Sequence, residues 1–244
     1  MRQVDLSSYD VFWAEFFGIE PQRLGESCVL VVKHARLGEY SGIWFFARGG
    51  SRVVSAPEAW LEPLRTRSAE IAAAGLPGPE LLRDLLGGDP ERVIGPTYQG
   101  CLLSGAFRPV RDARVRRLGA ADEPATAALR ASCSEQDWDH SGLSGANEPR
   151  FGSFDDGQLV AMGGLEGWSV DTANPGVLCH PDHRGRGHAT AVASALVERA
   201  IAEGKLMLYQ TLLSNQASVA IATRLGFAQY ASHLAVRLQR GDAI

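Results

Sequence analysis

The stretch VLCHPDHRGRGHAT, residues 177–190, decides the fold of this chain. It predicts a strand that ends near Cys179, a glycine-rich loop and the N-terminus of a helix. Gly185 and Gly187 allow backbone angles that other residues rarely adopt, and they leave room for a ligand. The N–H groups of the first helical turn have no intrahelical acceptors, and the helix dipole makes this end positive. We therefore predict a phosphate-binding loop.

The segments on both sides of the loop favour this interpretation over a tight turn with incidental glycines. The helix expected from Gly187 to Glu203 places its apolar residues at steps of three and four, on one face. An Asp-Gly turn at residues 156–157 indicates a hairpin over 151–165. Further strands are expected at residues 115–118, 206–209 and 233–238, and further helices at 122–132 and 215–225. The loop lacks the third glycine of a dinucleotide-binding fingerprint, so it fits that motif poorly. It also lacks the Gly-Lys-Ser/Thr of a P-loop, which excludes that motif.

The first 110 residues carry no chemical motif that we identify. A helix is expected at residues 11–17, strands at 29–33, 43–47, 52–55 and 98–103, and helices at 57–74 and 79–86. The polar segment 108–114, which contains Pro109, separates this half from the next. We therefore predict an N-terminal α/β domain at residues 1–110, for packing and substrate shaping or with a site of its own, and a second domain at residues 111–244.

The composition excludes several classes of function. A net charge of −4 offers no broad basic surface for nucleic acid, and no window approaches the ~20 apolar residues that span a bilayer. The four cysteines form no C-x-x-C pair and suggest no disulfide framework. We expect a cytoplasmic protein, a monomer or a homodimer, that has neither nucleic acid nor a membrane as partner. The frequent Ala, Arg and Gly suggest a bacterial genome.

Two blocks of sequence carry a resemblance to a known family. The pattern R-x-x-G-x-A at residues 184–189, after V-x-C-x-P at 177–181, resembles motif A of the GNAT superfamily of acyl-CoA-dependent N-acyltransferases. Residues 215–227, which end in Leu-Gly-Phe, resemble the helix that follows in this family. The resemblance covers about residues 112–240 and implies an α/β fold, with a central mixed β-sheet flanked by helices. It leaves the N-terminal half as an additional domain or a degenerate GNAT-like copy.

The resemblance implies an N-acetyltransferase that moves an acetyl group from acetyl-CoA directly to a primary amine, on a small molecule or a peptide. In this family the strand backbone pairs with the pantetheine, the loop amides hold the pyrophosphate, and two strands splay to admit the thioester. The residues that the resemblance assigns to acetyl-CoA are Val177, Leu178, Cys179, Arg184, Gly185, Arg186, Gly187, His188, Ala189, Thr190 and Asn215. Asn215 equally fits a helix cap, and the two roles are compatible.

The residues for acid–base catalysis are less clearly indicated. Many members place a tyrosine as general acid three residues before the leucine of Leu-Gly-Phe, but here this position is Ala222. Tyr209 and Tyr230 are the candidate substitutes, and each also fits a half-buried strand residue. Glu166 and His180 are the candidate bases, and each also fits a structural position. Because of Ala222, a non-catalytic acyl-CoA-binding or sensing protein is the alternative.

Four side chains that could bind a metal lie close together in the sequence, namely Cys179, His180, His183 and His188. Adjacent strand residues point to opposite faces, so Cys179 and His180 should not share an ion. The spacing matches no familiar zinc pattern. We therefore expect no metal.

Overall fold

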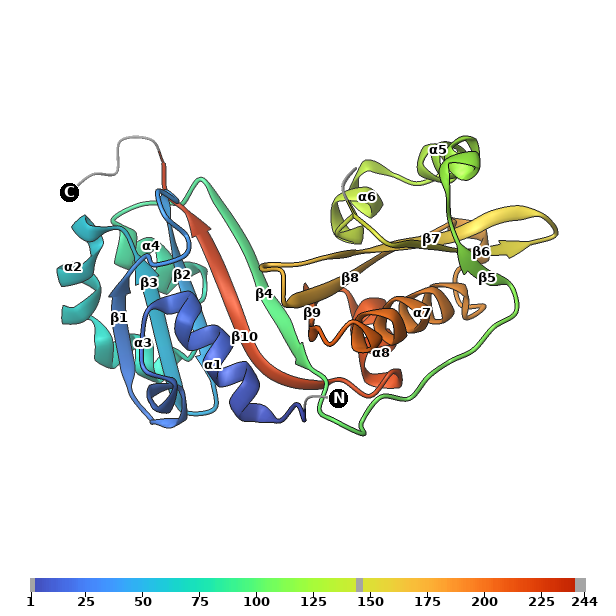
Figure 1. Ribbon diagram of the computed structural model, residues 1–244. Helices are drawn as coiled ribbons and strands as arrows, with labels where there is room; N and C mark the ends of the chain where they lie inside the picture. The colour runs from blue at the N-terminus through green and yellow to red at the C-terminus, as the bar shows by residue number, and fades with distance from the viewer. Residues whose placement is uncertain (1–2, 144–146, 240–244) are drawn as a thin grey trace. The chain divides into compact units, whose positions relative to one another are not determined.

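The computed structural model describes residues 3–143 and 147–239 and has a mixed α/β fold (Figure 1). The chain forms two compact units. The C-terminal unit comprises residues 100–211 and 216–228, together with the residues up to Val4. The N-terminal unit comprises residues 5–99, 212–215 and those from Gln229 onward. The two units are interleaved in sequence, because the last strand of the chain belongs to the N-terminal unit.

The sheet of the C-terminal unit has the strand order β9-β8-β7-β6-β5. Strands β5 to β8 pair antiparallel with their neighbours, whereas β8 and β9 are parallel, so the sheet is mixed. The strands are β5 (Val115–Arg117), β6 (Arg150–Asp155), β7 (Gln158–Glu166), β8 (Thr172–Cys179) and β9 (Leu206–Leu212).

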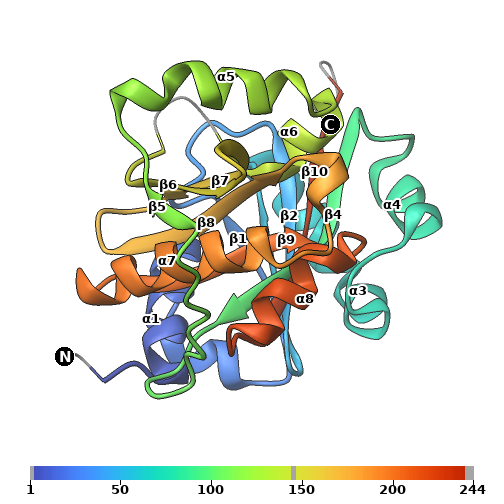
Figure 2. The ribbon, with the colours of Figure 1, turned by 90° about the vertical axis from the view of Figure 1, so that its right-hand side faces the viewer.

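Helices cover both faces of this sheet (Figures 1 and 2). α5 (Glu123–Ala131) and α6 (Glu135–Ser141) lie on one face, and α7 (His188–Ala202) and α8 (Gln216–Arg224) lie on the other. α7 approaches the sheet closely because Gly163 in β7 has no side chain. A Cβ at this position would lie 2.9 Å from atoms of Leu196 and Val192. The apolar face predicted for this helix is therefore the face that it buries.

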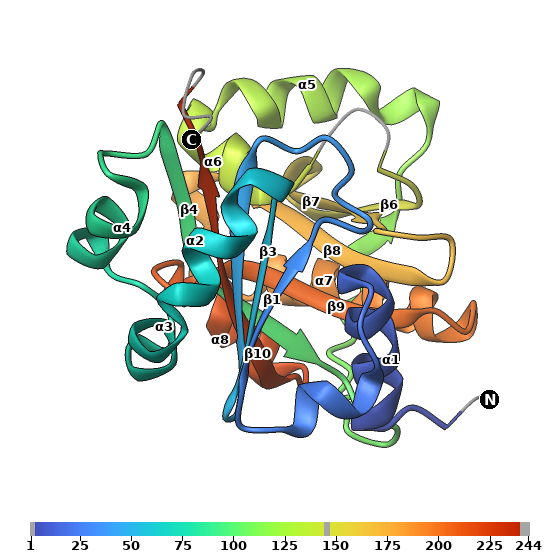
Figure 3. The ribbon, with the colours of Figure 1, turned by 90° about the vertical axis from the view of Figure 1, so that its left-hand side faces the viewer.

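The N-terminal unit contains strands in the order β1-β3-β2-β10-β4 (Figure 3). β1 and β3 are parallel, while β2 is antiparallel to both β3 and β10. The strands are β1 (Val29–Lys33), β2 (Gly42–Arg48), β3 (Ser51–Ala56), β4 (Arg92–Cys101) and β10 (Ala228–Arg237).

Alternate residues of β2 build two apolar layers in this unit, as the strand period of two requires. Aromatic side chains of α1 (Leu6–Phe17) pack against Trp44 and Phe46. Ile43 and Phe45 belong to the core shared with α2, α3 and α4 on the opposite face. These helices are α2 (Leu61–Thr66), α3 (Ser68–Ala74) and α4 (Pro79–Leu86).

One predicted helix of this unit is wrong. The segment 57–74 is not continuous but consists of a 3-10 turn at Glu58–Trp60 followed by α2 and α3. The two helices separate because the backbone of Arg67 leaves the helical region, with φ −102° and ψ 14°. In the described residues, none of the helices combines the length and the apolar character that crossing a membrane requires.

Candidate active site

The glycine-rich loop joins β8 to α7. After Cys179 a short 3-10 turn spans Pro181–His183, and α7 begins at His188. Gly185 and Gly187 have φ angles of 76° and 87°, in the left-handed region that favours glycine. A Cβ at either position would meet no atom within 4 Å. The backbone angle, and not crowding, is therefore what requires glycine here.

The N-terminus of α7 has no side-chain cap. Its first intrahelical hydrogen bond is donated by the Ala191 N–H to the Gly187 carbonyl oxygen, at 3.0 Å. The N–H groups of residues 188–190 consequently have no intrahelical acceptor. The helix dipole adds partial positive charge at the same place. This end of α7 suits a phosphate group.

The two arginines of the loop have different surroundings. Arg184 Nη2 pairs with Asp137 Oδ1 of α6 at 2.8 Å, and its Nε lies 3.5 Å from the Cys179 carbonyl oxygen. Arg186 is more exposed, and its Nη1 lies 3.9 Å from Asp155 Oδ2. Arg184 is thus partly committed to holding the loop, whereas Arg186 has more freedom to follow a bound anion.

Strands β8 and β9 separate soon after they begin. Within the described residues their parallel pairing consists of Thr172 with Leu206 and Ala173 with Met207. At the next position the side chain of Asn174 replaces the strand pairing, because its Oδ1 accepts a hydrogen bond from the Gln210 N–H at 2.9 Å. In the part of the chain that the structure describes, the remainder of β8 pairs with β7 alone.

The direction of the backbone groups in β8 follows from two hydrogen bonds. Residues of a β-strand alternate in the side toward which their N–H and C=O point. The His180 N–H donates to the Val160 carbonyl oxygen at 2.8 Å, on the β7 side. The Asp171 carbonyl oxygen accepts from the Leu206 N–H at 2.8 Å, on the β9 side. Even-numbered residues therefore face β7, and odd-numbered residues face β9.

Val177 and Cys179 consequently direct their N–H groups toward β9, beyond the point where the pairing ends. Pro175, which faces the same side, has no N–H that would need a partner. An extended ligand could bind this edge as an added strand binds a sheet. Leu178 lies in the paired part of β8 opposite Met162, and its side chain is in the core. Burial raises the pKa of the Cys179 thiol to about 11.

Tyr209 lies in β9, in the part that no longer pairs with β8. Its side chain is buried, and its hydroxyl lies 3.1 Å from the Ser218 hydroxyl of α8. The ring contacts Phe227 edge-on. Burial raises the pKa of the Tyr209 hydroxyl to about 12. This side chain is therefore a protonated phenol at neutral pH.

The two candidate bases come from different elements. Glu166 is exposed at the end of β7, opposite Asn174 in the strand pairing. His180 follows β8, and its Nδ1 accepts a hydrogen bond from the Asp182 N–H at 3.2 Å. Among the described residues, no hydrogen bond or ion pair links Glu166, His180 and Tyr209 to one another. They do not form a preassembled catalytic group.

Three other residues that the sequence analysis considered lie outside the loop and strand β8. Asn215 lies directly before α8, and Ala222 is fully buried within that helix. Tyr230 belongs to the N-terminal unit, where its hydroxyl donates to Asp10 Oδ1 at 2.5 Å. Burial and this carboxylate raise the pKa of Tyr230.

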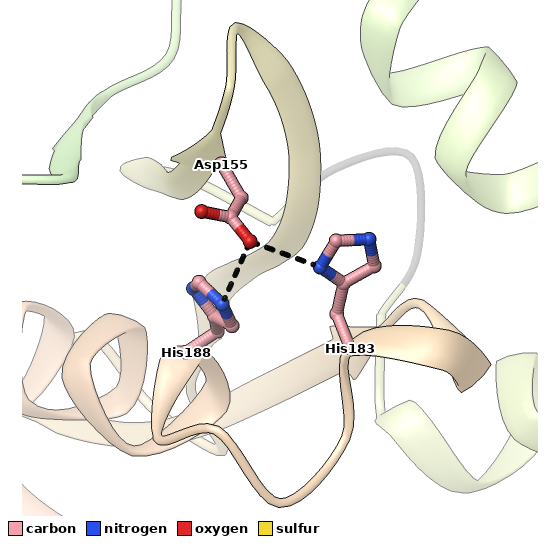
Figure 4. A group of neighbouring side chains, drawn as sticks. All are labelled: Asp155, His183 and His188. Carbon is pink, nitrogen blue, oxygen red and sulfur yellow. Dashed lines mark ion pairs between the residues drawn. The ribbon is translucent and has the colours of Figure 1, made fainter.

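The structure also brings together three side chains that the sequence did not indicate as a group (Figure 4). Asp155 ends β6, His183 lies in the 3-10 turn, and His188 begins α7. Asp155 Oδ2 lies 3.3 Å from His183 Nδ1 and 3.8 Å from His188 Nε2. Asp155 was missed because, in the sequence, it is simply the residue before the Asp-Gly turn.

Comparison with known proteins gives a family match for this part of the chain. Residues 113–227 match the Acetyltransferase (GNAT) family. A search of curated proteins gives no match. Among solved structures, a GNAT-family acetyltransferase from Novosphingobium aromaticivorans has 23% identity and a TM-score of 0.48, covering 62% of this chain and 67% of its own. A GCN5-related N-acetyltransferase from Kribbella flavida has 18% identity and a TM-score of 0.49, covering 75% and 77%.

The ribosomal-protein-S18-alanine N-acetyltransferase from Escherichia coli has 18% identity and a TM-score of 0.38, covering 53% of this chain and 97% of its own. The family match spans β5 to α8, and so it includes the uncapped N-terminus of α7 and the separating strands. Residues 113–227 are an acyltransferase domain of the GNAT family.

Proposed function

We propose that this protein transfers the acetyl group of acetyl-CoA to a primary amine by direct attack in a ternary complex. The observation that carries the proposal is the edge of β8 from which β9 separates. Strand β8 leads through the glycine loop to the uncapped N-terminus of α7. Such an edge offers N–H groups to an extended chain with amides. The helix N-terminus offers them to a diphosphate.

The acyl donor would follow the chain in this order. The pantetheine amides would pair with the backbone of Val177 and Cys179, since these residues face away from β7. The pyrophosphate would bind the amides of residues 184–190, with Arg184 and Arg186 supplying charge. Asn215, before α8, would contact the pantetheine or adenosine arm.

Transfer then forms a C–N bond and breaks the C–S bond of the thioester. The attacking amine must be neutral, so its ammonium first releases a proton to Glu166 or His180, directly or through water. The N–H of Val177 or Cys179 polarises the thioester carbonyl, whose oxygen gains charge as the amine attacks. After the attack the nitrogen releases its second proton to solvent as the C–S bond breaks. The leaving thiolate takes a proton either from solvent or from Tyr209, which then regains one from solvent. No metal takes part in these steps.

Turnover is tested by measuring thiol release from acetyl-CoA in the presence of a library of primary amines. We expect thiol release with at least one amine and one acetylated product per thiol. Tight binding of acetyl-CoA without thiol release on any amine would instead favour a binding or sensing protein, for which the buried Ala222 is the motivating residue.

The role of the loop is tested by a matched pair of glycine variants at the two ends of α7. Gly187 and Gly204 have φ angles of 87° and 73°, and a Cβ at either would meet no atom within 4 Å. Gly187→Glu and Gly204→Glu should therefore each lose about 1–2 kcal/mol of the free energy of unfolding through backbone strain. We expect only Gly187→Glu to abolish acetyl-CoA binding in calorimetry, because its carboxylate occupies the phosphate position. Equal affinities in the two variants would contradict the assignment.

A further inference from the structure

Three potential metal ligands converge from separate elements of the C-terminal unit (Figure 4). Asp155 Oδ2, His183 Nδ1 and His188 Nε2 all lie within 4.8 Å of one another. The carboxylate oxygen is 3.3 Å from the first nitrogen and 3.8 Å from the second. Both imidazole rings direct a nitrogen toward the carboxylate.

Both nitrogens lack a hydrogen-bond partner among the described residues, although both are buried. The His188 side chain is completely inaccessible, and its other nitrogen, Nδ1, lies 2.9 Å from the Ser153 hydroxyl. A buried polar atom left unsatisfied costs about 1–3 kcal/mol, so native proteins rarely contain two together. An atom placed between these groups would satisfy both nitrogens.

Within residues 3–143 and 147–239 the protein does not supply that atom, since even the 3.3 Å approach of His183 Nδ1 to Asp155 Oδ2 leaves this nitrogen without a hydrogen bond. Arg186 and Arg114 approach the two Asp155 oxygens to 3.9 and 4.0 Å, which is beyond hydrogen-bond range. A proton on His188 Nε2 would face Asp155 Oδ2 at 3.8 Å, also too far.

We propose that Asp155, His183 and His188 bind a divalent transition-metal ion, with Zn²⁺ the best match, in a site that goes beyond the acyl-transfer function. Imidazole and carboxylate ligands suit zinc, whose bonds to them are about 2.0–2.2 Å long. A tetrahedral site then needs ligand atoms about 3.4 Å apart. Two of the three separations are already 3.3 and 3.8 Å. Water completes the coordination.

The position of the site indicates what the ion does. His183 and His188 flank the glycine loop, and Asp155 ends β6 next to the hairpin turn. An ion bound to all three would tie the loop to the β6–β7 hairpin. When His188 Nε2 binds the ion, Nδ1 carries the ring proton and donates it to the Ser153 hydroxyl, 2.9 Å away, which makes Ser153 a positioning residue. The prediction of no metal considered the histidines of this loop without Asp155.

The test uses the full-length chain without a histidine tag, freed of metal by a chelator and titrated with Co²⁺. We expect one Co²⁺ per chain with the visible absorption of a tetrahedral site, and displacement of that absorption by Zn²⁺. Asp155→Asn and His183→Gln should each weaken Co²⁺ binding at least tenfold. Ser153→Ala should weaken it by about 10- to 100-fold, the effect expected when a ligand loses its orienting partner.

His180→Gln is the matched control, because His180 lies in the same loop with its ring 5.3 Å from that of His183 but outside the ligand group. It should leave the Co²⁺ affinity unchanged. Circular dichroism and thermal unfolding verify that each variant folds. Asp155→Asn and His183→Gln are the primary tests, because both side chains are partly exposed and their replacement disturbs the fold least. Unchanged Co²⁺ affinity in Asp155→Asn, absence of stoichiometric Co²⁺ in the wild type, or equal losses in His180→Gln and His183→Gln would overturn the proposal.

Discussion

At the scale of single residues, Tyr209 offers the sharpest question about the chemistry. Its pKa is raised to about 12 by burial, so it keeps its proton through pH 6–10 and can donate it to a thiolate. If it does, Tyr209→Phe should lower kcat by about 100-fold, the usual contribution of a general acid, with acetyl-CoA affinity nearly unchanged. Steady-state kinetics of thiol release and calorimetry with acetyl-CoA measure these two quantities.

Tyr230→Phe is the comparison for this prediction, because it removes the other buried tyrosine hydroxyl that the sequence suggested as an acid. The Tyr230 hydroxyl is already committed to Asp10 in the N-terminal unit. If Tyr209→Phe retains its kcat, solvent protonates the leaving thiolate and Tyr209 is only a buried strand residue. If Tyr230→Phe alone loses kcat, the acid has been assigned to the wrong tyrosine.

The sequence predicted the backbone conformation of two loop residues for a local reason. Gly185 and Gly187 were identified because a phosphate loop needs unusual backbone angles, and both have positive φ. Asp155 could not be identified, because its proximity to His183 and His188 depends on how β6 lies beside α7. No spacing rule connects residues that are brought together only by the packing of a sheet against a helix.

At the scale of elements, Asn174 links β8 to β9 where the two strands separate, because its Oδ1 accepts a hydrogen bond from the Gln210 N–H. Asn174→Ala would leave that N–H without its partner and should lower the free energy of unfolding by about 1 kcal/mol. It should also weaken acetyl-CoA binding several-fold, because the strand edge loses its fixed position. Urea unfolding and calorimetry provide the two measurements.

Asn174→Asp is the control, since a carboxylate oxygen can accept the same hydrogen bond. It should retain most of the stability that Asn174→Ala loses. Comparable losses in both variants would show that the amide of Asn174 acts through something other than the Gln210 N–H.

Periodicity predicted α7 to within a residue at each end, because its apolar face is regular and buried along its whole length. It failed at residues 57–74, where three short elements carry apolar residues at compatible spacing. The separation of β8 and β9 was expected only from the family resemblance, because no pattern within a strand reveals where pairing with its neighbour stops.

At the scale of the whole molecule, the interleaving of the two units along the chain could not be predicted from the sequence. The closing strand was expected within the segment that resembles the family, but β10 from Gln229 onward belongs to the N-terminal unit. Leu234 and Val236 of this strand are buried in that unit's core. The boundary at residues 110 and 111, and the degenerate GNAT-like origin of the N-terminal half, stay predictions.

The stability of the molecule toward acid should depend on His233 in β10. This side chain is buried, stacks on Trp44 with ring centroids 4.4 Å apart, and its Nδ1 contacts the Thr97 hydroxyl at 2.8 Å and the Gln99 amide. Burial lowers its pKa to about 3, whereas in the unfolded chain it is about 6.5. Between these values the unfolded chain binds the extra proton, so stability falls as the pH falls from about 6.5 toward 3.

This group alone should decrease the free energy of unfolding by about 1.4 kcal/mol per pH unit within that window. His233→Asn keeps an acceptor near the Nδ1 position but cannot titrate, so its unfolding free energy should depend less steeply on pH. Burial lowers the pKa values of His34 and His188 too. These two histidines contribute equally to the pH dependence of the unfolding free energy in the wild type and in His233→Asn. Urea unfolding followed by tryptophan fluorescence at several pH values between 4.5 and 7.5 therefore isolates His233 as the difference between the two slopes. Parallel slopes would mean that His233 becomes accessible to protons without unfolding.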